Sequence, residues 1–152
     1  MGKRALFLDW GGTLALAHDN RTVVDEHGNP VLMPNVAATL IRVRPSFDAC
    51  FIVSNQARVG RREITEREVI RRFAWLNHRL GDIVTDWRLC PHEDADGCPC
   101  RKPNPGMFVD LAGAWAVDLP ASTHVGDSPK DAAAAAAAGV GTFCWARAFF
   151  DW

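Results

Sequence analysis

Short apolar runs alternate with segments of helical character along most of the chain. The runs are rich in branched and aromatic residues, which is typical of strands buried on both faces of a sheet. They lie at residues 6–8, 49–53, 87–90, 122–125 and 142–145. Helical spacing or high helix propensity marks the segments between them, at residues 35–44, 65–81, 107–117 and 131–138. This alternation predicts an α/β fold with a doubly wound, Rossmann-like and mostly parallel sheet.

One predicted helix begins at a capping box and ends at a glycine. Thr65 can accept a hydrogen bond from the amide of Glu68, whose side chain can reach back to Thr65. Apolar residues then continue at helical spacing up to Gly81, a common helix stop.

Two β-prone runs at residues 22–24 and 31–33 flank a turn rich in Gly, Asn and Pro at residues 25–30. This pattern predicts a small hairpin, a flap near residues 19–33 that projects over the carboxyl ends of the strands. A chain of 152 residues is the size of one domain. We therefore expect residues 1–152 to form a single domain, with no segment long enough for a large cap domain.

The net charge of −1 makes no overall electrostatic footprint for nucleic acid, although arginines concentrated between Arg58 and Arg79 can form a local basic face. The sequence has no apolar run long enough to span a bilayer and no signal-peptide pattern at its N-terminus. We therefore expect a soluble, cytoplasmic protein with no membrane partner, and find no support for a specific nucleic-acid partner. The oligomeric state is left open.

Polar side chains follow the predicted strands at their carboxyl ends, where open α/β sheets bind ligands. Asp9, Ser54 and Asp127 each lie at such an end, and Lys102 lies in the loop after the third strand. Asp9 and Asp127 can share Mg²⁺, which prefers oxygen ligands. The Ser54 hydroxyl and the Lys102 ammonium can meet the remaining charge of a phosphate. In this arrangement Asp9 is placed as a nucleophile on phosphorus.

A second cluster of ligand-type residues lies between the third strand and Lys102. Its three thiols and one imidazole come from Cys90, His92, Cys98 and Cys100. Cysteines clustered in this way indicate a metal rather than a disulfide framework in a reducing compartment. Three thiolates and one imidazole complete a tetrahedral Zn²⁺ set with no position left for water. We therefore predict a structural zinc that pins the loop 90–100, which presents Arg101 and Lys102.

Four segments resemble, in the expected order, the motifs of the haloacid dehalogenase (HAD) superfamily. They are Asp-Trp-Gly-Gly-Thr-Leu at 9–14, Ser-Asn-Gln at 54–56, Lys-Pro at 102–103 and Gly-Asp-Ser-Pro-Lys-Asp at 126–131. The chain is most similar to the capless phosphatases that include D-glycero-D-manno-heptose 1,7-bisphosphate phosphatase and the histidinol-phosphate phosphatases. The likeness covers nearly the whole chain, and the cysteine-rich run at residues 90–107 is especially specific. It implies a HAD-like fold.

The resemblance also implies roles for the motif residues. Asp9 is expected to be the aspartyl-phosphate nucleophile, and Ser54 and Lys102 are expected to hold the phosphoryl group. The implied Mg²⁺ ligands are Asp9, Gly11 through its carbonyl, and Asp127, with Asp131 supporting the metal. The implied substrate contacts are Thr13, Asn55 and Arg101. For Asp131 an alternative is a purely structural acid, stabilised by the dipole at a helix N-terminus.

Gly11 departs from the family pattern. The family has a second aspartate at this position, which acts as general acid on the leaving group and then as base for water. Losing a general acid–base costs about two to four orders of magnitude in rate. Either the protein is still a phosphatase, with a good leaving group or a borrowed acid, or it is a weakened phosphate-binding or regulatory module.

A third interpretation resembles phosphonoacetaldehyde hydrolase, whose related motif also has a small residue at this position. That chemistry needs a Schiff-base lysine in a cap domain. The only lysines are Lys3, Lys102 and Lys130, at the terminus or inside motifs, so we reject this interpretation. We therefore expect a Mg²⁺-dependent phosphomonoester hydrolase that acts on a small phosphorylated metabolite of the sugar-phosphate kind.

Overall fold

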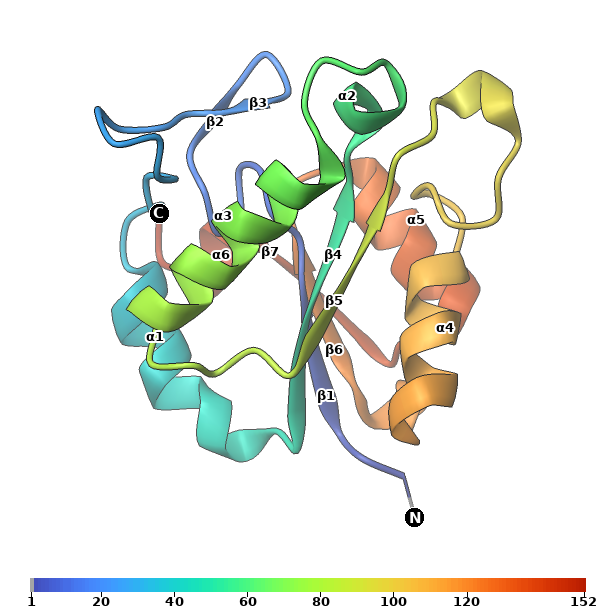
Figure 1. The fold of residues 1–152 in the computed structure, drawn as a ribbon. Helices are drawn as coiled ribbons and strands as arrows, with labels where there is room; N and C mark the ends of the chain where they lie inside the picture. The colour runs from blue at the N-terminus through green and yellow to red at the C-terminus, as the bar shows by residue number, and fades with distance from the viewer. Residues whose placement is uncertain (1) are drawn as a thin grey trace.

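The computed structural model describes residues 2–152, which fold around a five-stranded parallel sheet (Figure 1). The strands of this sheet are β1 (Ala5–Leu8), β4 (Ala49–Asn55), β5 (Asp86–Cys90), β6 (Thr123–Gly126) and β7 (Thr142–Trp145). They lie in the order β5-β4-β1-β6-β7, and each neighbouring pair is parallel. The carboxyl end of β1 therefore lies between those of β4 and β6. The expected doubly wound α/β fold is confirmed.

Helices cover both faces of the sheet. The helices α1 (Val36–Val43), α3 (Glu66–Arg79) and α6 (Ala146–Phe149) lie on one face, and α4 (Gly106–Trp115) and α5 (Pro129–Ala138) lie on the other (Figure 1). Side chains alternate along β1, so Leu6 and Leu8 enter one core, whereas Ala5 and Phe7 enter the other. Burial on both sides explains why the strands are continuous apolar runs. Among residues 2–152, no helix has both the length and the hydrophobicity needed to cross a membrane.

The longer elements begin and end within about two residues of their predicted limits. The helix predicted from residue 131 begins at Pro129, because Ser128 and Asp131 form a reciprocal capping box. The sequence pattern does not mark the shortest elements, which hold too few residues for a period to show. These are α2 (Ala57–Gly60), α6, and the 3₁₀ turns Arg44–Ser46, Asp94–Asp96 and Leu119–Ala121.

The predicted capping box at the start of α3 is only half formed. The Thr65 hydroxyl accepts from the amide of Glu68 at 3.1 Å, as expected. The Glu68 carboxylate does not turn back to Thr65 but accepts from Arg71 Nε at 2.9 Å. A charged guanidinium is a stronger donor than a backbone amide, so Arg71 takes the carboxylate.

The hairpin differs from the predicted one in its turn. Its strands are β2 (Ala17–His18) and β3 (Arg21–Thr22), joined through Asp19 and Asn20 with φ values of 49° and 60°. Positive φ at both central residues is the geometry of a tight hairpin turn that Asp and Asn tolerate. The expected turn at residues 25–30 follows it and is closed by an antiparallel bridge between Val24 and Pro30.

Two contacts hold this segment on the sheet. The indole of Trp10 is 1% exposed and donates to the Thr22 hydroxyl at 2.9 Å, so Trp10 is a core residue and the anchor of the hairpin. Arg71 donates to the Gly28 carbonyl at 2.6 Å and to Asn29 Oδ1 at 3.0 Å, which ties the second turn to α3.

Replacing Thr65 by alanine removes the side-chain acceptor at the start of α3. We expect the free energy of unfolding to fall by about 1 kcal/mol, the usual cost of losing an N-cap. Urea unfolding of Thr65→Ala beside Thr65→Ser measures this loss, because serine keeps the acceptor. Equal stability of wild type and Thr65→Ala contradicts the capping role.

Candidate active site

Predicted site residues meet around a buried ammonium at the carboxyl ends of the strands. Lys102 is 2% exposed, and its Nζ donates to Asp9 Oδ1 at 2.8 Å, Asp131 Oδ1 at 2.7 Å and the Val53 carbonyl at 2.9 Å. Burial lowers the pKa of the ammonium, but the carboxylates of Asp9 and Asp131 outweigh it, so that the pKa is raised. The lysine is therefore a charged and fully hydrogen-bonded link between β1, β4 and α5.

Asp131 lies buried at the N-terminus of α5 and uses both carboxylate oxygens. Oδ1 accepts from Lys102 and lies 3.4 Å from His124 Nε2. Oδ2 accepts from the amides of Asp127 and Ser128, each at 3.1 Å, and from the Ser128 hydroxyl at 3.0 Å. Burial by itself raises the pKa of Asp131. The bonds from His124 and Lys102 outweigh burial and hold this pKa well below its usual range. The helix-terminus role is therefore present, together with a contact to Lys102.

Gly12 lets the Asp127 carboxylate approach the site. Gly12 has a φ of +75°, and a Cβ built on it would lie 2.1 Å from Asp127 Oδ2, too close for any side chain. One oxygen from each of Asp9, Asp127 and Asp131 lies within 4.8 Å of the others. Loss of water contact and the Asp9 carboxylate raise the pKa of Asp127 to about 7. Three acidic groups crowded in this way are a suitable donor set for a hard divalent cation.

Ser54 lies near the end of β4 and is 2% exposed. Its hydroxyl accepts from Gln56 Nε2 at 2.9 Å and lies 3.5 Å from the Asn55 carbonyl. Gln56 has no role assigned from the sequence beyond its place in the motif, yet it orients the hydroxyl predicted to bind phosphate.

Asn55 and Thr13 contact other site residues. The Asn55 side chain donates to the Lys102 carbonyl at 3.0 Å and accepts from the Lys102 amide at 2.9 Å. The Thr13 hydroxyl donates to Asp9 Oδ2 at 3.3 Å, and Thr13 has no exposed surface. The geometry therefore favours a positioning role for both residues over the substrate contacts that the resemblance implies.

Gly11 and Arg101 contact different segments of the chain. A Cβ built on Gly11 would lie 3.3 Å from the Ala17 Cβ, so the hairpin passes over the place where the resemblance expects an aspartate. Arg101 donates from Nε to Asp94 Oδ1 at 2.8 Å and from Nη1 to the His92 carbonyl at 3.0 Å. Arg101 is thus held against the cysteine-rich loop, as a residue presented by that loop.

His124 is a candidate that the sequence patterns did not single out. It is fully buried in β6, with Nδ1 at 3.0 Å from the Phe7 carbonyl and Nε2 facing Asp131. In the sequence, the one sign of a special role for His124 is that a titratable residue stands inside an apolar run. Its Nε2 approaches Asp131 Oδ1, the same oxygen that accepts from Lys102.

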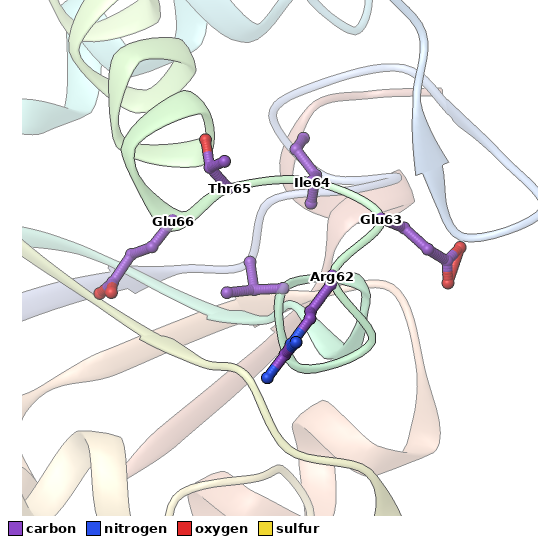
Figure 2. A pocket seen from close by; sticks show the side chains of 6 residues that line it. Arg62, Glu63, Ile64, Thr65 and Glu66 are labelled. Atoms are coloured by element: carbon purple, nitrogen blue, oxygen red, sulfur yellow. The ribbon is translucent and has the colours of Figure 1, made fainter.

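An open depression of about 340 Å³ lies on the loop between α2 and α3 (Figure 2). Its lining residues are Val59, Arg62, Glu63, Ile64, Thr65 and Glu66. In Figure 2 the Glu63 side chain points away from Arg62. The depression follows the motif at residues 54–56 along the chain, and neither Asp9 nor Lys102 lines it.

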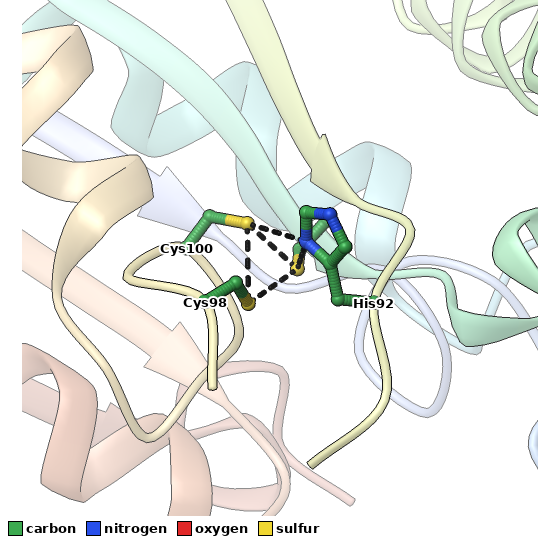
Figure 3. Close-up of side chains that lie close together, drawn as sticks. His92, Cys98 and Cys100 are labelled. Atoms are coloured by element: carbon green, nitrogen blue, oxygen red, sulfur yellow. Dashed lines mark hydrogen bonds between the residues drawn. The ribbon is translucent and has the colours of Figure 1, made fainter. Parts of the chain in front are cut away.

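The four predicted zinc ligands converge beyond the end of β5 (Figure 3). The sulfur of Cys90 lies 3.5 Å from that of Cys98 and 2.8 Å from that of Cys100, and the last two sulfurs are 3.6 Å apart. His92 Nδ1 lies 3.4 Å from the Cys90 sulfur and 3.3 Å from the Cys100 sulfur. Tetrahedral zinc with Zn–S bonds of about 2.3 Å separates its sulfurs by about 3.8 Å. Two of the three sulfur pairs are within about 0.3 Å of that value, and the Cys90–Cys100 pair must open by about 1 Å to fit the ion.

Comparison with known proteins gives relatives over most of the chain. A family model described as HAD-hydrolase-like matches residues 99–147. The D-glycero-β-D-manno-heptose-1,7-bisphosphate 7-phosphatase of Rhodopseudomonas palustris is 38% identical over 121 residues, covering 73% of this chain and 67% of that protein. The enzyme of the same name from Vibrio cholerae is 33% identical over 152 residues, covering 93% of this chain and 80% of that protein.

Solved structures agree with these relatives. The D,D-heptose 1,7-bisphosphate phosphatase of B. bronchiseptica, in complex with magnesium and phosphate, has a TM-score of 0.80 and 28% identity, covering 91% of this chain and 78% of that one. A HAD-superfamily hydrolase of Geobacter sulfurreducens has a TM-score of 0.60 at 14% identity, covering 93% of this chain and 94% of that one, and shows the fold alone.

Replacing Asp127 by asparagine is expected to stabilise the magnesium-free protein more at pH 8 than at pH 5. A pKa raised from 3.8 to about 7 means that the folded protein binds this proton more tightly than the unfolded chain. The wild type therefore loses stability as the pH rises from about 4 to 7, whereas asparagine does not titrate.

Because Asp127 is partly exposed, we expect the stability difference between variant and wild type to grow by only about 1 kcal/mol between the two pH values. Urea unfolding in magnesium-free buffer measures it. A difference that stays constant or shrinks at pH 8 shows that the carboxylates do not repel one another.

Proposed function

Because the chain belongs to the haloacid dehalogenase superfamily, with heptose-bisphosphate phosphatases among its relatives, we propose that it hydrolyses a small sugar phosphate through Asp9. That the protein is a phosphatase follows from this membership. The observation that best supports the route through Asp9 is the Lys102 ammonium, which lies between Asp9 and Asp131 where a phosphoryl group needs positive charge. By their names, the relatives act on heptose bisphosphate, so this compound is the first candidate substrate.

In the proposed reaction, Asp9 attacks phosphorus through Oδ2. Oδ1 is bound by Lys102 at 2.8 Å, whereas Oδ2 accepts a longer bond of 3.3 Å from Thr13. The attack forms a bond from Asp9 to phosphorus and breaks the bond to the ester oxygen, which leaves and takes up a proton. Water then attacks the aspartyl phosphate, frees Asp9 and releases inorganic phosphate. The Ser54 hydroxyl bonds the phosphoryl oxygens as charge develops on them, and Lys102 does the same by releasing one of the three acceptors that its ammonium bonds in the free protein.

Asp9, the Gly11 carbonyl and Asp127 hold Mg²⁺ in this proposal. Support comes from the crowded carboxylates and from Gly12, whose missing Cβ leaves room for the Asp127 oxygen. When bound, the ion neutralises charge on the phosphoryl group. Asp131 supports this site indirectly, because Lys102 and the amides before α5 already occupy its oxygens.

Gly11 favours a second candidate function. It supplies no acid on the leaving-group side, and the Ala17 methyl group is the nearest side chain to it. A phosphatase without this acid works best on a substrate whose leaving group needs no proton, such as an acyl or anomeric phosphate. Alternatively, the leaving group takes its proton from the substrate itself. The second candidate is a phosphate-binding or regulatory module that has the same pocket and little turnover.

Two substitutions separate the candidates. For a phosphatase, Asp9→Asn should lose at least about a hundredfold in the rate of acetyl phosphate hydrolysis with Mg²⁺, because the nucleophile is gone. Gly11→Asp should gain about tenfold or more on sugar phosphates, whose leaving groups need a proton, and little on acetyl phosphate. The added Cβ would lie 3.3 Å from Ala17, so a small shift accommodates it. Assays of released phosphate measure these rates.

The module predicts another pattern. Wild type then equals Asp9→Asn on every substrate, while Gly11→Asp gains activity. Phosphate still raises the melting temperature of the inactive wild type, because a ligand that binds the folded state stabilises it.

We also propose that the loop 90–100 binds a structural zinc ion. In this proposal the loop and the hairpin belong to one and the same domain. The proposal is supported by the short separations among its ligand atoms and by the Arg101 amide, which donates to the Cys98 sulfur at 3.3 Å. A closed site of three thiolates and one imidazole leaves no position for a substrate. Its effect on catalysis is therefore indirect, through the chain that leads to Arg101 and Lys102. A reducing, cytoplasmic location stays a prediction from the sequence.

Elemental analysis of the purified protein should find about one zinc per chain. Cys98→Ser should lose most of this zinc and melt at a lower temperature, because metal binding contributes to folding. Cys144→Ser is the matched control, since Cys144 lies in β7 outside the cluster. A metal-free wild type that is stably folded rules out the structural zinc.

A further inference from the structure

His124 is a polar ring in largely apolar surroundings beside the proposed active site. It has no exposed surface, and the centroid of its ring lies 4.9 Å from that of Phe108 and 5.7 Å from that of Phe143. Nδ1 lies 3.0 Å from the Phe7 carbonyl and Nε2 lies 3.4 Å from Asp131 Oδ1, so both ring nitrogens face acceptors. Burying an imidazole without such contacts is costly. A phenylalanine would fill the same space, so packing alone does not explain the histidine.

The Lys102 ammonium uses all of its N–H donors in the free protein. They bond Asp9 Oδ1, Asp131 Oδ1 and the Val53 carbonyl. In the proposed reaction the same ammonium bonds a phosphoryl oxygen, so one of these bonds must break. The bond that breaks leaves a buried acceptor without its donor, which is costly unless another donor is close by. The acceptor that has a second donor is therefore the one that Lys102 releases most easily.

Asp131 is the acceptor with a second donor. Among the side-chain nitrogens of residues 2–152, His124 Nε2 alone shares an acceptor with Lys102, and that acceptor is Asp131 Oδ1. The other oxygen, Oδ2, accepts from two amides and one hydroxyl at the start of α5. When Lys102 turns away, Asp131 therefore still has donors for both of its oxygens.

We propose that His124 is a positioning residue, whose Nε2–H holds Asp131 Oδ1 when Lys102 turns from that oxygen to the phosphoryl group. The inference rests on the proposed function, in which Asp9 attacks a phosphate bound by Lys102. The contact of 3.4 Å is longer than an ordinary N–H···O bond, and it shortens when the lysine leaves the shared oxygen. His124 touches neither the substrate nor the metal in this proposal and acts through Asp131.

Two substitutions at His124 separate hydrogen-bond donation from packing. His124→Phe keeps a ring of similar size and removes the donor. His124→Gln places an amide nitrogen about as far along the side chain as Nε2, so it can donate to Asp131. Titration calorimetry with inorganic phosphate and Mg²⁺ should give His124→Phe a dissociation constant about tenfold to a hundredfold above that of wild type, the effect of one hydrogen bond to a charged group. His124→Gln should bind phosphate within about threefold of wild type, because the donor is present again.

Phe143→Leu is the matched control, because Phe143 packs against the same ring and has no polar group for Asp131. It should bind phosphate as wild type does. Unchanged phosphate binding in His124→Phe overturns the positioning role, as does equal weakening in His124→Gln or in the control. If wild type itself binds no phosphate, the proposed function fails and the inference fails with it.

A spectrum of the wild type tests the donor without any substitution. Long-range ¹H–¹⁵N correlations of ring-labelled histidine show which nitrogens carry a proton, and His124 is the one fully buried histidine among residues 2–152. With phosphate and Mg²⁺ bound, its Nε2 should carry a proton that exchanges slowly with water. An Nε2 without a proton in that state overturns the proposal even where neither variant folds, because no donor then replaces Lys102.

Discussion

The buried ammonium of Lys102 is the interaction on which the rest of the site depends. It joins Asp9 after the first strand to Asp131 in α5, and it bonds the carbonyl of Val53 in the strand between β1 and β5. A charge this deeply buried is tolerated only with several partners, and removing one partner of such a pair costs about 3–5 kcal/mol. The same contacts therefore contribute to the stability of the fold and to the placement of Asp9, the proposed nucleophile.

Several neighbours hold this lysine in place without reaching the opening of the site. Asn55 bonds both polar groups of the lysine main chain, and the cysteine-rich loop fixes the residues before it. His124 Nε2 lies 3.4 Å from Asp131 Oδ1, the oxygen that accepts from Lys102. In the proposed zinc-bound form this loop affects chemistry at a distance, because the positions of Arg101 and Lys102 follow from its conformation.

The sequence predicts the fold well because buried parallel strands appear in it as apolar runs. The polar residues at the carboxyl ends of these strands lie at one edge of the sheet. Asp9, Lys102, Asp127 and Asp131 could be grouped on that basis, with the family resemblance supplying their roles. The directions of short polar side chains could not be predicted, so the contacts of Thr13 with Asp9 and of Asn55 with Lys102 become visible only in the structure. Likewise, Glu68 pairs with Arg71 by a competition between donors that no local motif reveals.

The central place of β1 has a consequence for how the protein is made. Phe7 and its partner His124 in β6 are 117 residues apart, so β1 obtains its second neighbour only through a contact of long sequence separation. Parallel pairing over such separations is slow, because long loops must close before any contact forms. Until β6 pairs, one edge of this apolar strand stays open, and an open apolar edge can pair with another chain.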